Sequence, residues 1–178
     1  LDGAELYQIG VSLASGGELA EALDAEPVEA LDFIRNRLHS DPKLQDRIRQ
    51  TADATGEILD TASPDLRKLR KQLRGSRNRI VQKLDAFVAD LPERVRVADA
   101  SVGIRNGRYV VPVRREGKKD IGGIVHDESH SGATLFVEPP MAIELTNELR
   151  RLEREETREI HRILSDLTGT LRPLHPAL

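Results

Sequence analysis

The middle of this chain reads Val102-Gly103-Ile104-Arg105-Asn106-Gly107-Arg108-Tyr109-Val110-Val111-Pro112-Val113, and this stretch decides the fold. Apolar and polar residues alternate on both sides of Asn106-Gly107. This pattern is the strongest short signal for a β-hairpin, because both central residues of a type I′ turn need positive φ. A two-residue turn places Ile104 opposite Tyr109, so the register of the hairpin is predicted as well.

The residues around this hairpin extend it into a small antiparallel unit. The same register sets Val102 opposite Val111, which gives one consistent apolar face. Pro112 cannot donate to a β-ladder, so its strand should lie at an edge or turn the missing N–H outward. Further strands are expected at residues 94–97, 121–126 and 133–137, with a loop at 127–132.

A long helix is expected on each side of this β segment. The first begins at Ser63-Pro64-Asp65, where Ser caps free amides, Pro pre-sets the first helical φ and Asp suits the positive helix end. Its apolar residues recur every three or four positions up to Pro92: Leu66, Leu69, Leu73, Ile80, Leu84, Phe87 or Val88, and Leu91. The second begins near Pro140 and repeats the spacing at Leu145, Leu149, Leu152, Ile160, Ile163 or Leu164, Leu167 and Leu171. This spacing predicts a coiled-coil-like antiparallel pair.

A polar break interrupts the apolar seam of each long helix. If Leu91 lies near Met141, Arg77 on the first helix comes level with Glu155 and Glu156 on the second. We therefore predict that Arg77 pairs with Glu155 or Glu156 and fixes the register of the two helices.

The first sixty residues predict a set of short helices. They are expected at residues 3–14 and 18–24, from Pro27 through Leu31 and Ile34 to Leu38, and after the cap Asp41-Pro42, followed by an extended piece at 56–59. The predicted fold is therefore mainly α with a small antiparallel β insertion. We divide it into residues 1–62, 63–93, 94–138 and 139–178.

Composition restricts the chemistry that the chain can support. Cysteine is absent, which excludes disulfides, thiolate metal sites and cysteine nucleophiles. The 3% of aromatic residues against 32% of charged ones favours long solvated helices. Without a leader or a long apolar run, the sequence predicts a soluble cytoplasmic fragment of a larger protein that has no contact with membranes.

Charge is distributed unevenly along the sequence. Residues 1–62 hold five Lys and Arg against thirteen Asp and Glu, whereas residues 94–119 hold eight against two. Residues 63–93 are also basic, and residues 120–178 are acidic. A positive middle segment points to a polyanionic partner.

The hairpin concentrates this positive charge. Its register sets Arg105 directly opposite Arg108, where like charges repel and an anion would relieve the repulsion. The candidate contacts with a nucleic-acid backbone are Arg105, Arg108, Arg114, Arg115, Lys118 and Lys119. A solvated basic hairpin face is the alternative interpretation. No Phe or Trp accompanies these cations, which argues against base stacking.

The first long helix offers a second basic run. It comprises Arg67, Lys68, Arg70, Lys71, Arg74, Arg77, Arg79 and Lys83. These residues could follow phosphates, but Lys and Arg also suit any solvated helix face. Both interpretations stay open.

Two short motifs were considered for catalysis. His126-Asp127-Glu128-Ser129-His130 differs from H-E-x-x-H, and a strand and loop do not place two histidines on one helical face, so we expect neither a metal site nor catalysis. Asp127 and Ser131 are expected to hold the turn. Gly117-Lys118-Lys119 lacks the rest of a phosphate-binding loop, so we expect no ATP hydrolysis and no cofactor in this segment.

The sequence resembles the bacterial MutS-II branch of the MutS family. The resemblance is carried by residues 107–114, by residues 144–149 and above all by Gly123-Ile124-Val125-His126-Asp127-Glu128-Ser129-His130-Ser131-Gly132-Ala133-Thr134-Leu135-Phe136-Val137-Glu138-Pro139. It implies a helical core, two long lever helices and a β clamp inserted between them. In relatives the clamp touches DNA backbone without reading sequence, and ATP-driven dimerisation moves the levers.

The resemblance also implies what the larger protein does. Full-length members bind ATP and Mg²⁺, form homodimers and usually carry a nuclease domain; they suppress homologous recombination by acting on branched DNA. None of that enzymatic machinery matches residues of this chain, so only the clamp role is carried over, onto the six cations named above. A structural arm that binds ribosomal RNA or a partner protein is the alternative, because some members rescue collided ribosomes.

Overall fold

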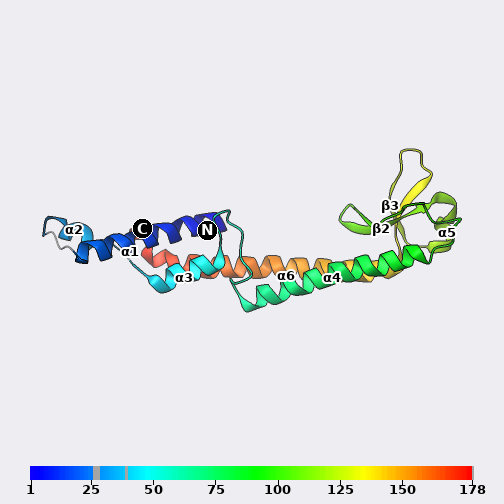
Figure 1. Cartoon of the computed structure of the whole chain (residues 1–178). Coiled ribbons are helices and arrows are strands. Elements are labelled where there is room, and N and C mark those ends of the chain that lie inside the picture. The colour runs from blue at the N-terminus through cyan, green and yellow to red at the C-terminus, as the bar shows by residue number, and fades with distance from the viewer. Residues whose placement is uncertain (26–28, 39, 178) are drawn as a thin grey trace. The chain divides into compact units, whose positions relative to one another are not determined.

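A computed structural model describes residues 1–25, 29–38 and 40–177 of the chain. Its helices are α1 (Gly3–Ala25), η1 (Glu29–Leu31), α2 (Asp32–Arg35), α3 (Pro42–Thr51), α4 (Pro64–Ala89), η2 (Arg115–Gly117), α5 (Lys118–Ile121), α6 (Pro140–Leu171) and η3 (Arg172–Ala177). Its strands are β1 (Gly103–Arg105), β2 (Arg108–Arg114), β3 (Ile124–Glu128) and β4 (Thr134–Glu138). The fold is mainly α with a small antiparallel β insertion between two long helices, as predicted (Figure 1).

The chain divides into two compact units, and both long helices contribute to both of them. Unit 1 comprises Leu1–Arg70 and Glu156–Leu178, and unit 2 comprises Lys71–Glu155. Counted from the sequence, unit 2 holds sixteen Lys and Arg against thirteen Asp and Glu, whereas unit 1 holds eleven against seventeen. The positive charge of the chain therefore lies in the unit that contains the sheet.

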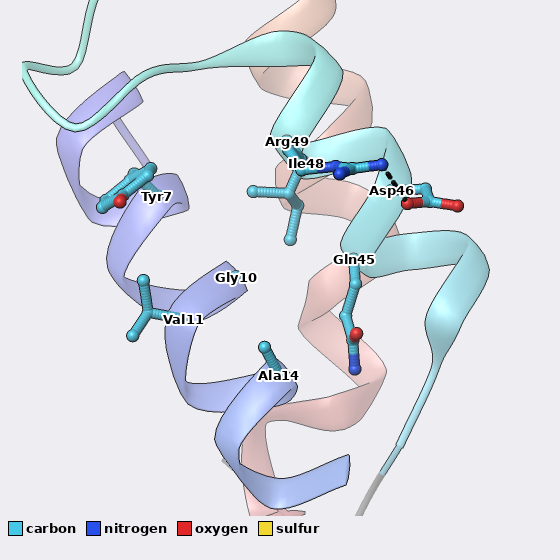
Figure 2. A pocket seen from close by; sticks show the side chains of 8 residues that line it. All are labelled: Tyr7, Gly10, Val11, Ala14, Gln45, Asp46, Ile48 and Arg49. Carbon is cyan, nitrogen blue, oxygen red and sulfur yellow. Dashed lines mark hydrogen bonds and ion pairs between the residues drawn. The ribbon is translucent and has the colours of Figure 1, made fainter. Parts of the chain in front are cut away.

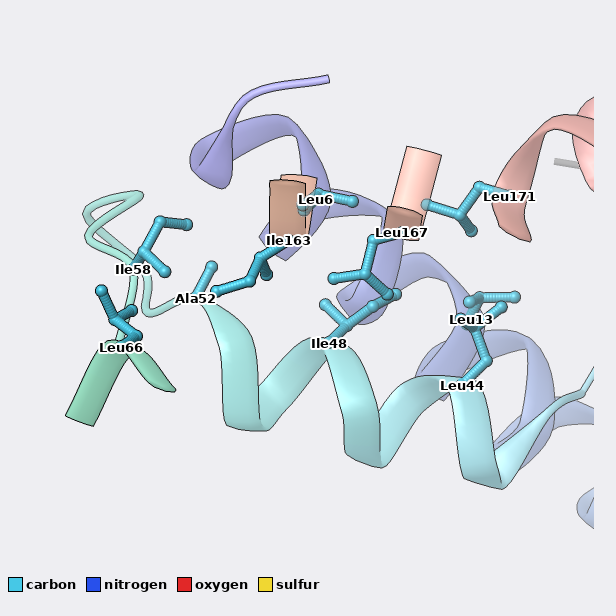
Figure 3. Close-up of a cluster of buried hydrophobic side chains, with 10 residues drawn as sticks. All are labelled: Leu6, Leu13, Leu44, Ile48, Ala52, Ile58, Leu66, Ile163, Leu167 and Leu171. Carbon is cyan, nitrogen blue, oxygen red and sulfur yellow. The ribbon is translucent and has the colours of Figure 1, made fainter. Parts of the chain in front are cut away.

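The core of unit 1 forms where α1, α3 and the last part of α6 come together (Figure 3). Its buried side chains are Leu6, Leu13, Leu44, Ile48, Ala52, Ile58, Leu66, Ile163, Leu167 and Leu171. Burying one Leu or Ile side chain fully stabilises a fold by about 1.5–3 kcal/mol. The core of unit 1 is thus a cluster of aliphatic side chains from α1, α3, α4 and α6, with Ala52 and Ile58 from the segment between α3 and α4.

Helix α1 is continuous, so the prediction of separate helices at residues 3–14 and 18–24 is wrong. Gly17, inside the expected break, is buried, and a Cβ there would lie 3.0 Å from Oγ of Ser40. Nearby, the amide of Gln45 on α3 donates to the carbonyl of Leu13 at 2.9 Å. The close contact with α3 offsets the helix-breaking tendency of glycine, which is about 1 kcal/mol relative to alanine.

The helix predicted from Pro27 to Leu38 is also wrong in the residues that the structure describes. Pro27 and Val28 lie outside the described residues; from Glu29 onward the chain forms only the short η1 and α2, and Leu38 is not helical. Helix α2 buries no side chain, and Phe33 is 66% exposed. A helix needs an apolar face in contact with a core to grow beyond one turn.

The predicted helix caps are confirmed. The amide of Leu44 donates to the Asp41 carboxylate at 3.0 Å, and the amide of Leu66 donates to Oγ of Ser63 at 2.9 Å. The Ser63 hydroxyl in turn donates to Glu159 on α6 at 2.7 Å, so one residue both starts α4 and joins it to α6. The extended piece predicted at 56–59 forms a single bridge, Ala52 to Ile58.

The apolar seams of the long helices are confirmed, but the polar pair between them is not. Leu73, Ile80 and Leu84 on α4, with Leu149 and Leu152 on α6, are buried in unit 2. Arg77 pairs with Glu153 at 3.1 Å, Glu156 pairs with Arg70 at 2.8 Å, and Glu155 pairs with Arg151. The prediction assumed that Leu91 lies opposite Met141, but α4 ends at Ala89, and the acidic partner of Arg77 lies two residues earlier than expected.

The sheet of unit 2 has the strand order β1-β2-β4-β3, with antiparallel neighbours. Val111, Val113 and Val137 on its central strands are fully buried. Pro112 lies opposite Phe136 of β4, and the amide of Arg114, two residues on, points to the carbonyl of Val95. The proline nitrogen therefore points away from β4, beyond the end of β1, which is the outward orientation predicted for it.

The outer parts of the sheet differ from the prediction. Residues 94–97 form only one bridge, Arg96 to Val113, and Ile121 belongs to α5 rather than to a strand. Val102 lies outside β1, so its expected place opposite Val111 is not part of the ladder. The edge strand β3 carries an irregularity between Val125 and Asp127, which sets His126 in a bulge. Strand β1 is short because Pro112 of β2 has no N–H that could donate a hydrogen bond to a longer β1.

Candidate nucleic-acid interface

The β1–β2 hairpin has the turn and the register that the sequence predicts. Asn106 and Gly107 adopt φ of 51° and 70°, as a type I′ turn requires. Ile104 lies opposite Tyr109, and Arg105 lies opposite Arg108. Ile104 is nevertheless 56% exposed, so only the central part of the apolar face is buried.

Arg105 is held on three sides by its own unit. Its Nε donates to the Asp127 carboxylate of β3 at 3.0 Å, and a terminal nitrogen donates to the carbonyl of Ile104 at 3.0 Å. Its guanidinium carbon lies 4.3 Å from the centre of the Phe136 ring on β4. This ring is not evident from the sequence around the cations, because Phe136 comes thirty-one positions after Arg105 in the chain and only the sheet brings the two together.

Arg108 belongs to a buried polar network. A terminal nitrogen contacts Glu138 at 3.3 Å and Asn147 of α6 at 3.0 Å. The other Glu138 oxygen lies 2.8 Å from Nε2 of His126, and Glu138 itself is only 1% exposed. A buried carboxylate needs such partners to stay ionised. The repulsion expected between Arg105 and Arg108 is thus relieved by Asp127 and Glu138, two carboxylates of the same sheet.

The other four predicted cations follow β2 into η2 and α5. Arg115 pairs with Glu128 and donates from Nε to the carbonyl of Gly132, which anchors the β3–β4 loop. Nε of Arg114 donates to the carbonyl of Arg96 at 3.1 Å, and Nζ of Lys118 donates to the carbonyl of Gly123 at 2.9 Å.

Three of the six predicted cations and one further arginine keep an unneutralised charge. Within the described residues, no carboxylate pairs with Arg96, Arg114, Lys118 or Lys119. We call this group the basic patch. The patch comprises residues before β1, at the end of β2 and in α5, and the bridge of Arg96 to Val113 brings Arg96 beside Arg114. Arg96 was not among the predicted contacts, because it is remote from the hairpin in sequence.

The comparisons with known proteins give the family of the chain. It is 48% identical over 170 residues to Endonuclease MutS2 of Geobacillus thermodenitrificans, a match that covers 93% of this chain. It is 39% identical over 178 residues to Endonuclease MutS2 of Enterococcus faecalis, covering 97% of this chain. This chain corresponds to a segment of the MutS-II family. No family model matches it.

The MutS-II relatives are much longer than this segment. The chain spans about a fifth of the length of the curated relatives that it matches, 22% of both proteins named above. A third relative, Endonuclease MutS2 of Gemmatimonas aurantiaca, is 48% identical over 123 residues, which is 69% of this chain and 15% of that protein.

In the histidine-containing loop of this MutS-II segment, most residues have a structural role. Ser129, rather than Ser131, holds the turn: its hydroxyl accepts from the amide of Thr134 at 3.1 Å, and its carbonyl accepts from Gly132. Asp127 accepts from its own neighbour Glu128 and from Arg105. No group of three or more metal-binding side chains occurs in the part of the chain that the structure describes.

Some cations of the basic run on α4 form ion pairs within their own unit, Arg70 in unit 1 and Arg77 in unit 2. Arg70 contacts Asp60, Glu156 and the carbonyl of Ile58. Although partial burial opposes it, the hydrogen bonds from Arg70 to Asp60 and Glu156 raise the pKa of this arginine. Arg70 therefore stays charged as a structural residue of the MutS-II core, and it offers nothing to a phosphate.

Unit 1 contains a groove of about 370 Å³ between α1 and α3 (Figure 2). Tyr7, Val11 and Ala14 of α1 line one wall, and Gln45 and Arg49 of α3 line the other. Arg49 is paired with Asp46, as the dashed line in Figure 2 shows. None of the described helices is both long enough and apolar enough to cross a membrane.

Proposed function

We propose that this chain is the part of a MutS-II protein that contacts nucleic-acid backbone without reading its sequence. In this proposal residues 94–138 form a clamp, residues 63–93 and 139–178 form levers, and residues 1–62 belong to a helical core. The basic patch is the observation that carries the proposal, since Arg96 and Arg114 are neighbours, Lys118 and Lys119 follow shortly in the chain, and no described carboxylate pairs with any of the four. Phosphates are the partners that such a group suits best.

The internal ion pairs divide the six predicted contacts into two groups. Arg114, Lys118 and Lys119 contact phosphate directly, because their charge is available. Arg105, Arg108 and Arg115 contribute less to affinity, because Asp127, Glu138 and Glu128 already hold them. Binding a phosphate at Arg108 would require breaking a pair with a buried carboxylate, which is costly, whereas the more exposed pairs of Arg105 and Arg115 only reduce the charge that is available.

A salt series tests the proposal. Titrating the chain with duplex DNA at several salt concentrations should give a linear fall of log affinity with log salt. Replacing Lys119 with alanine should reduce the slope by about 1 and weaken binding to every sequence equally. Arg49→Ala is the matched control, since it removes an 80% exposed cation from unit 1 and should leave the slope unchanged. Absence of duplex binding at low salt, or equal effects of the two variants, would contradict the proposal.

The activity of the larger protein is a further part of the proposal. The relatives are named endonucleases, and they exceed this chain about fivefold in length. We place ATP and Mg²⁺ binding, homodimerisation and the nuclease outside this segment. The levers would transmit motion from that ATPase to the clamp, in a cytoplasmic protein that acts on branched DNA and suppresses homologous recombination.

A second function is favoured by the degree of internal pairing. Three of the six predicted contacts are already paired with carboxylates of the sheet. Such a surface suits a partner with a defined shape, such as ribosomal RNA or a protein, better than non-specific binding of a polyanion. Competition between duplex DNA and folded ribosomal RNA for the chain distinguishes the two. Tighter binding to the RNA at equal salt would favour the structural arm.

A further inference from the structure

We propose that Arg105, stacked on Phe136, forms a platform on which an unpaired nucleobase stacks. The inference rests on the proposed function and makes its ligand more specific: a nucleic acid with at least one base outside the duplex. Backbone contact alone would not require such a base.

The first argument is that the guanidinium of Arg105 is fixed as a flat surface. Phe136 supports one side of the plane at 4.3 Å, while Asp127 and the carbonyl of Ile104 hold its edge through hydrogen bonds of 3.0 Å. An arginine with one supported face and an immobilised edge loses little conformational entropy when a ligand binds. Few exposed arginines are prepared in this way.

The second argument is that the open side of this plane is accessible. The Arg105 side chain is 40% exposed. Gly103 lies on the same strand face, two residues before Arg105, and has no side chain; a Cβ built there would meet only the Arg105 guanidinium, at 3.8 Å. The hairpin therefore leaves open space next to the plane.

The third argument concerns the charge of Arg105. Asp127 pairs with it at 3.0 Å, so a phosphate would have to displace or approach a carboxylate. A nucleobase carries no charge and meets no such repulsion. Flat aromatic rings stack on guanidinium planes through cation–π and dispersion attraction, and every base has a suitable face.

The partner follows from the geometry of stacking. Within a duplex, both faces of a base are covered by its neighbours, and only the edges are exposed in the grooves. The platform therefore needs a base that is bulged, flipped or single-stranded.

The test compares three hairpin DNA probes of equal length in anisotropy titrations with the 178-residue chain. The first is fully paired, the second carries one bulged adenine, and the third carries an abasic bulge at the same position. The second and third share phosphates and shape, so their affinity ratio isolates the base. We expect the adenine bulge to bind about fivefold more tightly, since stacking contributes roughly 1 kcal/mol or more per base.

Arg105→Lys is the decisive variant. It keeps the charge toward Asp127 but removes the plane, so the ratio should fall to 1. Arg115→Lys is the matched control: Arg115 in η2 is paired with Glu128 of β3, and among the described residues only Arg105 lies over an aromatic ring, so the ratio should be preserved. Phe136→Leu, which keeps an apolar side chain, should lower the ratio as well.

The outcomes separate the two proposals. Equal binding of the adenine and abasic bulges overturns the platform and leaves backbone contact standing. A ratio that survives Arg105→Lys also overturns it. If none of the three probes binds at low salt, both the platform and the proposed function are wrong.

Discussion

Replacing Glu138 with glutamine tests the buried polar network of unit 2 most directly. The substitution keeps the shape of the side chain and its capacity to hydrogen-bond, but it removes the negative charge that faces Arg108 and His126. Glu138 is 1% exposed, and it lies at the end of β4, directly before α6. We therefore expect the loss to weaken the contact between the sheet and that helix.

The magnitude follows from the burial of the partners. Removing one member of a fully buried ion pair costs about 3–5 kcal/mol. Arg108 keeps 22% of its side-chain exposure and its hydrogen bond to Asn147, so water and an amide still solvate part of its charge. We expect a loss of about 2 kcal/mol in local stability, which is a roughly thirtyfold decrease in amide protection.

Hydrogen exchange measured by mass spectrometry is the appropriate assay, because it reports unit 2 separately from unit 1. Glu128→Gln serves as the control: that carboxylate is 60% exposed and pairs with Arg115, and an exposed pair contributes about 0.5 kcal/mol or less. Protection of β2 and β4 should fall in the first variant and stay nearly constant in the second. Equal protection in Glu138→Gln and Glu128→Gln would refute the importance of this network.

Unit 1 offers further predictions. Gly10→Ala should destabilise unit 1 by about 1 kcal/mol despite the better helix propensity of alanine, because the new Cβ would lie 2.8 Å from a methyl of Ile48. Gly169 has open space around it, so Gly169→Ala should instead stabilise the unit by about 0.5–1 kcal/mol. Thermal unfolding measures both effects. Ile48→Ala should cost about 3 kcal/mol and abolish the penalty of Gly10→Ala, which a double-mutant cycle would detect as non-additivity. The hydrogen bonds from Arg162 hold the pKa of Glu159 below its ordinary value of 4.5. The ionised carboxylate therefore stabilises the fold above pH 4.5, this contribution is lost as the pH falls through the lower folded-state value, and Glu159→Gln should reduce the acid sensitivity of unfolding. An unchanged acid transition in that variant would contradict the assignment.

Local signals in the sequence predicted the local structure well. The Asn106-Gly107 turn, the caps at Asp41 and Ser63, and the starts of the long helices depend on a few neighbouring residues, and these were correct. The continuous α1 was missed because Gly17 is tolerated only through contact with α3, a contact that no local pattern contains.

The candidate interface shows the same division between local and distant information. Sequence identified the cations and set Arg105 opposite Arg108, since the hairpin register is local. It could not show which carboxylates neutralise them, because Asp127 and Glu138 arrive from strands whose pairing depends on the whole sheet. The ring beneath Arg105 was missed for the same reason.

The bulge at His126 has a consequence for how this sheet behaves in solution. Strand β3 is an edge of the described sheet, and its Ile124 and Val125 are 49% and 41% exposed, the kind of surface on which a second chain can add a strand. The bulge interrupts the regular row of backbone donors and acceptors, and Asp127 and Glu128 place negative charge directly beyond it. A regular, uncharged β3 would invite edge-to-edge aggregation; the bulge and the two acids keep this edge closed to other strands.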